Sequence, residues 1–307
     1  MIKRMLRPFV RKIAAFLNRE DNLRRFRASR LYQELVLRNE NEVSRMQEEY
    51  SALAADSDAR NLLKLKERKY YSQNGEDGIL LYLFSLVGAG EKTFIEFGIE
   101  DGVECNAANL ALNFNWRGLF IEGSAALAGR ARRFYHGRHG CSPERVRIIN
   151  AFVTRENVNQ LFSEHGPHGE LALLSIDVDG NDYWIWDAVT AVKPRIVVIE
   201  YNASFGANRS VTVKYEPAFD RYQKHPSGWY HGASLKALAK LGERKGYVLA
   251  GCDSHGANAF FVRADIAKGR IIPMTPEEAY YPSIPRLREA TVEEQFARIA
   301  HLKLVEV

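Results

Sequence analysis

The chain has 307 residues, of which 46% are apolar and 26% charged, so it can bury a sizeable core and is neither disordered nor fibrous. Its net charge of +5 is unevenly distributed, because residues 1–30 contain ten basic and two acidic side chains while the remainder sums to −3. The body of the chain is therefore mildly acidic and gives no indication of nucleic-acid binding.

The cysteine content and the apolar runs predict where the protein resides. Cys105, Cys141 and Cys252 show no CxxC spacing, and their odd number cannot form a closed disulfide framework, which predicts a reducing compartment. No apolar run is long enough to span a bilayer, and charges interrupt the first seventeen residues too often for a secretory signal. We expect a cytoplasmic protein, or one held at the inner face of the membrane.

The first 69 residues predict a helical extension. An amphipathic basic helix is indicated by apolar residues at spacings of three and four, namely Ile2, Met5, Leu6, Phe9, Ile13, Phe16 and Leu17. This helix can lie among lipid headgroups, or it can pack on the protein's own body or on a second subunit. A short coiled coil, and with it a homo-oligomer, is indicated by Tyr32, Val36, Val43, Met46, Tyr50 and Leu53. The charged residues 60–69 predict a solvated connector.

From Tyr70 onward, short β-rich runs alternate with helix-length segments. The predicted strands are 93–97, 118–122, 146–150, 171–176, 196–201, 247–250 and 259–262. The predicted helices are 76–86, 106–113, 125–135, 156–164, 183–189 and 234–245. The early strands are almost continuously apolar, as in a parallel sheet covered on both faces, whereas the last two lie close enough to pair antiparallel at an edge. We expect an α/β domain over residues 70–264 and a tail over 265–307 that packs on it and ends in one helix.

Ligands of open α/β sheets bind beyond the carboxyl ends of the strands, so the residues that follow each predicted strand are candidates for a binding site. The first strand leads into Glu96-Phe-Gly98-Ile-Glu100-Asp101-Gly102, a glycine turn without GxGxxG spacing whose carboxylates would repel a pyrophosphate. This turn favours a cationic cofactor that has no phosphate, a description that S-adenosylmethionine meets. The second strand ends at Glu122, which can accept hydrogen bonds from both hydroxyls of a ribose. Each acidic residue alone could instead stabilise a turn or a helix start.

Oxygen-bearing side chains also follow the fourth and fifth predicted strands. Asp177 and Asp179 follow the fourth, and Glu200 and Asn202 follow the fifth, so all four should lie on the same edge of the sheet. Asp177, Glu200 and Asn202 could hold Mg²⁺ together with water and substrate oxygens. Alternatively, the two aspartates contact substrate and the amino-acid end of the cofactor, or cap the next helix.

The candidates for a general base that removes a hydroxyl proton are Asp179, His225 and His231, although a single histidine is more often structural. The segment 202–231 follows the fifth predicted strand and is rich in aromatic residues. Aromatic faces and polar edges suit a sugar or another polyol, so this segment is predicted to be a substrate-side insertion, with a packed lid as the alternative.

Seven stretches between residues 70 and 263 resemble one protein family, and they occur in the family's order. They are SQNGEDG after Tyr71, FIEFGIEDG ending at Gly102, WRGLFIEGS from Trp116, LSIDVDGND ending at Asp182, VVIEYNASFG ending at Gly206, YHGASLKAL from Tyr230 and GANAFFVR ending at Arg263. The chain thus resembles the FkbM-type branch of class I S-adenosylmethionine-dependent methyltransferases, including bacterial relatives in polysaccharide gene clusters. The resemblance implies a seven-stranded Rossmann-like fold, a bound S-adenosylmethionine and methyl transfer to oxygen.

The resemblance also assigns residues to the cofactor. It implies a segment closing over the cofactor (Gln73, Glu76 and Asp77), a cofactor turn (Glu96, Gly98, Asp101 and Gly102) and a ribose ligand (Glu122). Asn106, after this turn, and Asp177 are further residues that we expect to contact the cofactor. The SIDVDGND run is similar to the metal-bearing strand end of sugar O-methyltransferases. Here, however, Glu200-Tyr-Asn202 replaces the paired acidic residues usual on their next strand.

The sequence therefore predicts an O-methyltransferase that acts on a sugar hydroxyl of a surface polysaccharide or its precursor. Two alternatives stay open at this point. A metal-dependent glycosyltransferase could use Asp177-Val-Asp179 to hold a nucleotide-sugar diphosphate, but it leaves the acidic turn and Glu122 unexplained. A non-catalytic scaffold could bind the cofactor at the membrane without transferring its methyl group.

Overall fold

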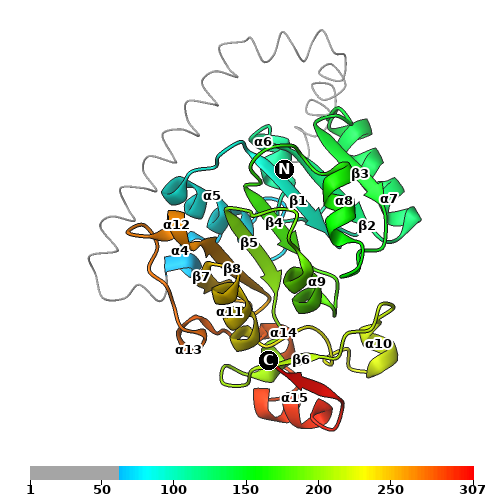
Figure 1. Ribbon diagram of the computed structural model, residues 1–307. Helices are drawn as coiled ribbons and strands as arrows, with labels where there is room; N and C mark the ends of the chain where they lie inside the picture. Colours follow the sequence, from blue (N-terminus) through cyan, green and yellow to red (C-terminus); the bar gives the residue numbers. More distant parts are fainter. Residues whose placement is uncertain (1–61) are drawn as a thin grey trace, which may run out of the picture.

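A computed structural model of the protein describes residues 62–307. The predicted amphipathic helix and coiled coil lie outside the described residues. The central element is a seven-stranded sheet with the order β3-β2-β1-β4-β5-β8-β7 (Figure 1). Its strands are β1 (Thr93–Phe97), β2 (Arg117–Glu122), β3 (Val146–Asn150), β4 (Leu173–Ile176), β5 (Ile196–Glu200), β7 (Tyr247–Cys252) and β8 (Asn258–Arg263).

The pairing of these strands confirms the predicted Rossmann-like fold. Strands β1 to β5 pair in parallel, with Glu96 opposite both Phe120 on β2 and Ser175 on β4. Strand β8 lies antiparallel between β5 and β7, so the last two predicted strands do pair antiparallel, and β7 forms the edge. Because β1, β2, β4 and β5 run in the same direction, their carboxyl ends meet at one edge of the sheet.

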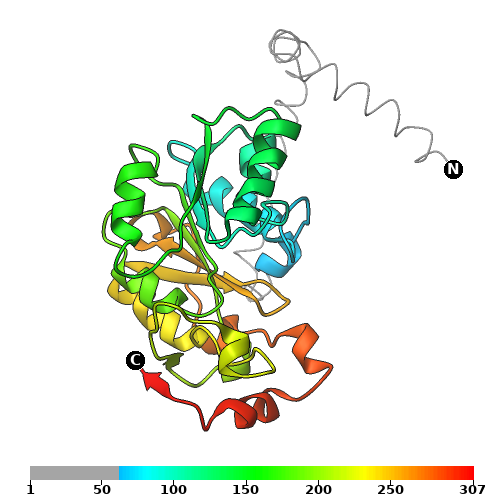
Figure 2. The same cartoon turned by 90° about the vertical axis from the view of Figure 1, so that its right-hand side faces the viewer.

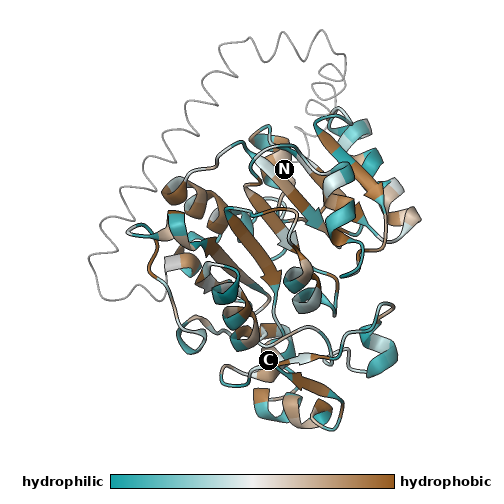
Figure 3. Ribbon diagram, viewed as in Figure 1, coloured by the Kyte–Doolittle hydropathy of each residue, from teal (hydrophilic) through white to brown (hydrophobic). Residues whose placement is uncertain are grey.

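The core lies on both faces of the sheet, because successive side chains of a strand point to opposite sides. On β1, Phe94 belongs to the cluster that packs with α5 (Glu76–Val87), α6 (Ala108–Asn113) and the α7 region, where α7 is Ala125–Arg132. Ile95 belongs to the opposite cluster, with α8 (Val158–His165), α9 (Asp182–Ala188) and α11 (Leu235–Arg244). Figure 3 shows the apolar strands between helices whose outer surfaces are more polar. Burial on both faces explains why the early strands read as continuous apolar runs.

A second, smaller layer joins the insertion after β5 to the C-terminal segment. Strand β6 (Val211–Val213) pairs antiparallel with β9 (Leu304–Glu306), and the two segments lie side by side in Figures 1 and 2. The helical elements of this layer and of the tail are η3 (Ala203–Phe205), α10 (Arg221–Lys224), α12 (Ala264–Ala267), α13 (Pro276–Ala279), α14 (Ile284–Leu287) and α15 (Val292–Ile299). A third cluster, which includes Phe205, Trp229 and Ile299, fills the space between them.

Three predictions about the chain need correction. The tail ends in strand β9 rather than in a helix, because β6 offers it a pairing partner that no sequence pattern announced. The predicted connector 60–69 contains α4 (Leu62–Lys66), whose Leu63 is buried against Gly251 of β7. The predicted helix 125–135 leaves α-geometry after Arg132 and continues as the wider turn η2 (Arg133–Arg138).

Between residues 62 and 307, none of the helices combines the length and the apolar character needed to cross a membrane. All three cysteines are buried and free of disulfides, as expected from their number.

Candidate functional site

A cavity of about 970 Å³ opens at the carboxyl ends of β1, β2, β4 and β5. Its lining contains seven carboxylates and one guanidinium, namely Glu100, Glu104, Glu122, Asp177, Asp179, Glu200, Asp220 and Arg221. A cleft lined mainly by one sign of charge concentrates ligands of the opposite sign. The cavity thus favours a cationic ligand and disfavours a pyrophosphate.

The turn after β1 forms one wall of the cavity and depends on Gly98. This residue has a φ of 77°, and a Cβ there would lie 1.5 Å from the carbonyl oxygen of Asp177. Only glycine permits both the left-handed backbone and this close approach. Consequently the β1 turn lies directly against the end of β4, which brings the two acidic regions of the sequence into one site.

Glu96 shapes this turn from behind the cavity. Its buried carboxylate accepts hydrogen bonds from the backbone N–H groups of Asn106 and Ala107, each at 2.8 Å, and from the Ser175 hydroxyl at 3.2 Å. Burial raises the pKa of Glu96 to about 7, although these hydrogen bonds oppose the shift. Asn106 donates from its side-chain amide to the same Ser175 hydroxyl at 3.0 Å. Both residues therefore support the turn after β1 rather than lining the cavity, in contrast to the predicted cofactor contacts.

Glu122 lines the cavity at the end of β2, as the sequence predicted. One carboxylate oxygen accepts the Glu100 N–H and the other accepts the Ser124 N–H, both at 2.8 Å. Two hydrogen bonds fix the carboxylate beside the β1 turn and the start of α7. Asp101 and Gly102 form the far side of this turn, where Asp101 accepts the Val103 N–H at 3.2 Å and Gly102 has a φ of 79°.

The loop before α5 contributes Gln73 to the cavity lining. The two acidic residues that follow it are internal. Asp77 accepts the backbone N–H groups of residues 70–72 at 2.7–2.8 Å, and burial raises its pKa. Glu76 accepts the Asn74 N–H at 2.7 Å and the Asn258 amide at 2.9 Å. Glu76 and Asp77 thus hold the loop in shape while Gln73 faces the site.

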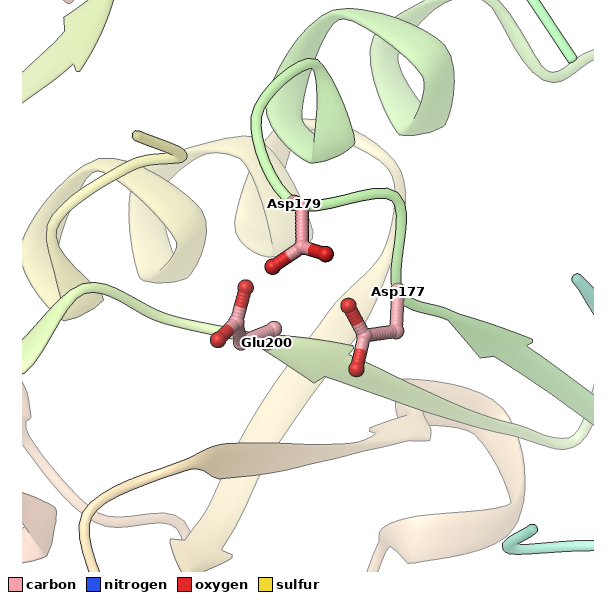
Figure 4. Close-up of side chains that lie close together, drawn as sticks. All are labelled: Asp177, Asp179 and Glu200. Atoms are coloured by element: carbon pink, nitrogen blue, oxygen red, sulfur yellow. The ribbon is translucent and has the colours of Figure 1, made fainter. Parts of the chain in front are cut away.

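Three carboxylates converge on the opposite wall of the cavity. In Figure 4 the side chains of Asp177 and Asp179, from the turn after β4, point toward Glu200 at the end of β5. One oxygen from each lies within 4.8 Å of the others. Asp179 has a φ of 56°, which is uncommon outside glycine, and Asp182 stabilises this turn by accepting the N–H groups of Val178 and Gly180.

The surroundings shift the pKa values of Asp177 and Glu200 in opposite directions. Desolvation within the cavity and repulsion from Glu200 raise the pKa of Asp177 well above its usual range, although the residue is exposed at the cavity surface. Burial alone would raise the pKa of Glu200 as well, but His231, Arg221 and Arg286 lower it to about 2. Asp179 forms an ion pair with Arg221. Within residues 62–307, Asp177 is the member of the group that forms no ion pair.

The structure gives Asn202 a different role from the predicted metal ligand. Its amide oxygen accepts the Ser204 N–H at 3.0 Å and an Arg286 N–H at 2.7 Å, while its amide nitrogen donates to the Trp229 and His231 carbonyls. These contacts use the whole side chain to stabilise η3 and the insertion. Asp179 takes the place beside Asp177 and Glu200 that the sequence assigned to Asn202.

The two histidines among the predicted bases also lie away from the cavity lining. His231 is fully buried behind Glu200, with its Nδ1 3.3 Å from a Glu200 oxygen. His225 contacts the Ser227 hydroxyl through Nδ1 at 2.7 Å, and its ring lies 6.3 Å from that of His301. Of the three candidates for a base, only Asp179 lines the cavity.

The insertion after β5 covers part of the site and is anchored to the Asp179 turn. Asn181 donates to the Glu216 carbonyl at 2.7 Å, and Phe219 packs so closely on Gly180 that a Cβ there would lie 2.2 Å from its ring. Arg221 reaches Asp179 from α10, and Tyr222 beside it lines the cavity with 67% of its surface exposed. The predicted substrate-side insertion therefore does border the site.

Several residues of the cavity lining are absent from the predicted site, among them Glu104, Phe152, Asp220 and Arg221. Phe152, which is 58% exposed, follows the carboxyl end of β3, and that strand end is the sequence signal that points to it. Arg221 begins α10 directly after its capping residue Asp220, so the helix start was detectable. Its pairing with Asp179, 42 positions earlier, has no local signal.

No family model matches the chain, and none of the curated proteins is similar to it. Among solved structures, it is similar to the SAH-bound methyltransferase PaMTH1 from Podospora anserina, with 12% identity over 71% of this chain and 87% of that one and a TM-score of 0.41. An SAH-bound O-methyltransferase from Bacillus cereus shows 12% identity over 71% and 97%, with a TM-score of 0.39. Cofactor-bound Rv0187 from MTB shows 18% identity over 70% and 90%, with a TM-score of 0.40.

Coverage varies among the similar structures, and the chain spans 61% of one from Galdieria sulphuraria. The TM-scores given above are all below 0.5, and it is the strand order and pairing of the sheet that show the Rossmann-like fold.

Proposed function

We propose that the protein is an S-adenosylmethionine-dependent O-methyltransferase that methylates a sugar hydroxyl of a surface polysaccharide or its precursor. The observation that supports this most strongly is the charge of the cavity. Its lining contains seven carboxylates, Glu122 among them, and only one guanidinium, and it includes Gly98 of the turn after β1. S-adenosylmethionine carries a sulfonium and an ammonium group and no phosphate, so it suits this lining. A nucleotide diphosphate would be repelled by it.

The residues around the cavity fit this cofactor in volume and in donor set. A cavity of about 970 Å³ lies at the upper end of the range for small-molecule sites and leaves room for part of an acceptor. Glu122 would accept hydrogen bonds from the ribose hydroxyls, and the exposed ring of Phe152 offers an aromatic face nearby. When bound, the cofactor supplies an electrophilic methyl group.

Asp177 is the residue that we assign to proton removal. Its raised pKa suits a carboxylate that takes the proton from an acceptor hydroxyl as the oxygen gains the methyl group. Asp179 forms an ion pair with the Arg221 guanidinium, and Glu200 lies against the His231 imidazole. Most of the rest of the rate enhancement would come from holding the acceptor hydroxyl in line with the methyl group of the cofactor.

The three carboxylates also have the oxygen ligands that Mg²⁺ prefers. Asp177, Asp179 and Glu200 would hold the ion, which would lower the pKa of a coordinated hydroxyl. Measuring methyl transfer in excess EDTA separates the two mechanisms. If EDTA abolishes activity and added Mg²⁺ restores it, the metal-dependent mechanism is supported. If the protein stays fully active in EDTA, no metal ion is essential and Asp177 alone is proposed to take the proton.

The insertion supports a polyol as the acceptor. Tyr222 presents an exposed aromatic face at the cavity, and Arg221 and Asp220 provide hydrogen-bonding groups beside it. Aromatic faces stack on the apolar face of a sugar ring while polar side chains bind its hydroxyl groups.

Parallel titration of the full chain with S-adenosylmethionine and with UDP-sugars tests the cofactor. Saturable binding of S-adenosylmethionine supports the proposal, and binding of UDP-sugars alone would replace it with a glycosyltransferase. Mass spectrometry of glycans from cells with and without the protein tests the acceptor. The proposal predicts one additional methyl group when the protein is present, and cofactor binding without any methylated product would favour the non-catalytic scaffold.

The partners predicted for residues 1–69 belong to the proposal as well. We expect a homo-oligomer through this segment, contact with an anionic membrane surface, and a cytoplasmic location. Sedimentation of the full chain with and without anionic vesicles, compared with a chain starting at residue 62, measures the first two expectations.

A further inference from the structure

Arg286 connects the C-terminal segment to the elements behind the cavity. Arg286, on the short helix α14, donates from Nη1 to the Asn202 amide oxygen at 2.7 Å and to the Ser204 hydroxyl at 2.9 Å. Its Nη2 lies 2.8 Å from Nε2 of His231. Ser204 also donates to Gln295 of α15 at 2.7 Å, so two elements of the tail meet at the η3 turn.

The contact between Arg286 and His231 fixes the tautomer of the imidazole ring. A guanidinium nitrogen only donates hydrogen bonds, so Nε2 of His231 must accept and can carry no proton. The single proton of the ring is then on Nδ1. That atom lies 3.3 Å from a Glu200 carboxylate oxygen, within ion-pair distance. Both atoms are buried, and neither has a partner with hydrogen-bond geometry within residues 62–307, so each is the nearest available partner of the other.

The chain of contacts therefore runs from the tail to the cavity in three steps. Arg286 donates to Nε2 of His231 and so leaves the ring proton on Nδ1. Nδ1 lies next to a Glu200 carboxylate oxygen, and Glu200 lies beside Asp177 in the cavity wall. If the imidazole carried its proton on Nε2, two donors would face each other on the Arg286 side and two lone pairs would face each other on the Glu200 side. The repulsion between the Nδ1 lone pair and the Glu200 oxygen would displace the carboxylate.

We propose that Arg286 is a positioning residue, which holds His231 in the Nδ1–H tautomer so that Glu200 keeps its orientation beside Asp177. The segment 265–307, which lies outside the family resemblance, thereby completes the site. The tautomer itself follows from geometry alone, whereas its effect on methyl transfer rests on the proposed function.

Long-range ¹H–¹⁵N correlation spectra of the full chain labelled with ¹⁵N-histidine test the tautomer. The wild-type spectrum should show His231 protonated on Nδ1 at pH 7, with the signal assigned by its loss in His231→Gln. Arg286→Met removes the donor and should move the proton to Nε2, while Arg286→Lys keeps a donor and should preserve Nδ1–H. Arg288→Met, on the exposed side of the same turn, is the matched control and should leave the signal unchanged.

A wild-type His231 protonated on Nε2 would overturn the proposal, and this result needs no variant to fold. An unchanged tautomer in a folded Arg286→Met protein would overturn it as well.

The second readout uses the methyl-transfer assay and S-adenosylmethionine binding. Arg286→Met should lower kcat by about 10- to 100-fold, the typical effect of losing an outer-shell hydrogen-bond partner, with cofactor Kd within about twofold of wild type. A shifted tautomer with unchanged kcat would refute the positioning role. If wild type itself transfers no methyl group, the proposed function fails, but the spectra still decide the tautomer.

Discussion

The two ends of the cavity use their carboxylates in opposite ways. At the β1–β2 end, Glu122 in the cavity lining and Glu96 behind it each accept two backbone N–H groups, so the main chain fixes the position of both carboxyl groups. At the β4–β5 end, Asp177, Asp179 and Glu200 face one another and are balanced by side-chain partners from other elements. The first arrangement fixes a shape through backbone hydrogen bonds, whereas the second brings like charges together at the cavity wall.

This difference suggests a division of labour within one cavity. Carboxylates held by the backbone keep their geometry without a ligand, which suits binding of a cofactor in a preformed site. Carboxylates that repel one another release electrostatic strain when they gain a proton or a cation, which suits chemistry. The predictions below would break or sharpen this contrast, starting with the largest effect.

The strongest expected effect is on the reaction itself. Asp177→Asn should lower the rate of methyl transfer by about 10²- to 10⁴-fold, because the amide cannot accept the hydroxyl proton. The rate is measured with labelled S-adenosylmethionine and a glycan fraction from cells that lack the protein. Asp187→Asn, an exposed residue on α9, is the matched control and should keep the wild-type rate. A fully active Asp177→Asn protein would remove Asp177 from the chemistry.

The next effect concerns cofactor binding. Glu122→Ala should weaken binding of S-adenosylmethionine by about 10- to 100-fold, since hydrogen bonds to a charged group contribute about 1.5–3 kcal/mol. Part of the loss would come from the Glu100 and Ser124 N–H groups, which lose their acceptor. Isothermal titration calorimetry measures the change, with Glu243→Ala on the exposed face of α11 as control. An unchanged Kd would refute the assignment of Glu122 to the ribose.

A smaller effect is expected at the insertion. Tyr222→Ala should raise the acceptor KM by about 2- to 10-fold, a loss of roughly 0.5–1.5 kcal/mol of aromatic contact, without changing cofactor Kd. Because Tyr222 is largely exposed, the variant should fold normally. A lower cofactor affinity together with an unchanged acceptor KM would place Tyr222 at the other end of the cavity.

The smallest effect is on stability and depends on pH. Glu96 has a pKa of about 7 in the folded protein, above the ordinary value of 4.5 that it regains on unfolding. The folded state therefore binds more protons between these values, so the free energy of unfolding should fall as pH rises from about 5 to about 7. Glu96→Gln removes this titration and should flatten the slope in urea unfolding curves. An equal slope in both proteins would show that Glu96 is ionised at lower pH.

The backbone at the site was largely predictable from the sequence, for a physical reason. Buried parallel strands need apolar runs, so 93–97 agrees with β1 to the residue and 196–201 differs from β5 by one residue. The glycine turn at Gly98 and the acidic strand ends also follow from local chemistry. Glu122, Asp177, Asp179 and Glu200 all line the cavity.

The partners of these residues were not predictable, because they come from distant parts of the chain. Arg221 and Arg286 lie 42 and 84 positions from Asp179 and Asn202, and no periodicity links them. Asn202 follows Glu200 by two residues and His231 lies beside Glu200 in space, yet both side chains are buried away from the cavity. A polar side chain near a strand end can either face the ligand or satisfy the backbone, and only packing decides between the two.

The division between the two ends of the cavity is tested most directly by measuring cofactor Kd and methyl-transfer rate for Glu122→Ala and Asp177→Asn in one experiment. The account predicts a crossed result, in which Glu122→Ala mainly weakens S-adenosylmethionine binding and Asp177→Asn mainly abolishes transfer at saturating cofactor. Equal losses of binding and of transfer in both variants would contradict it.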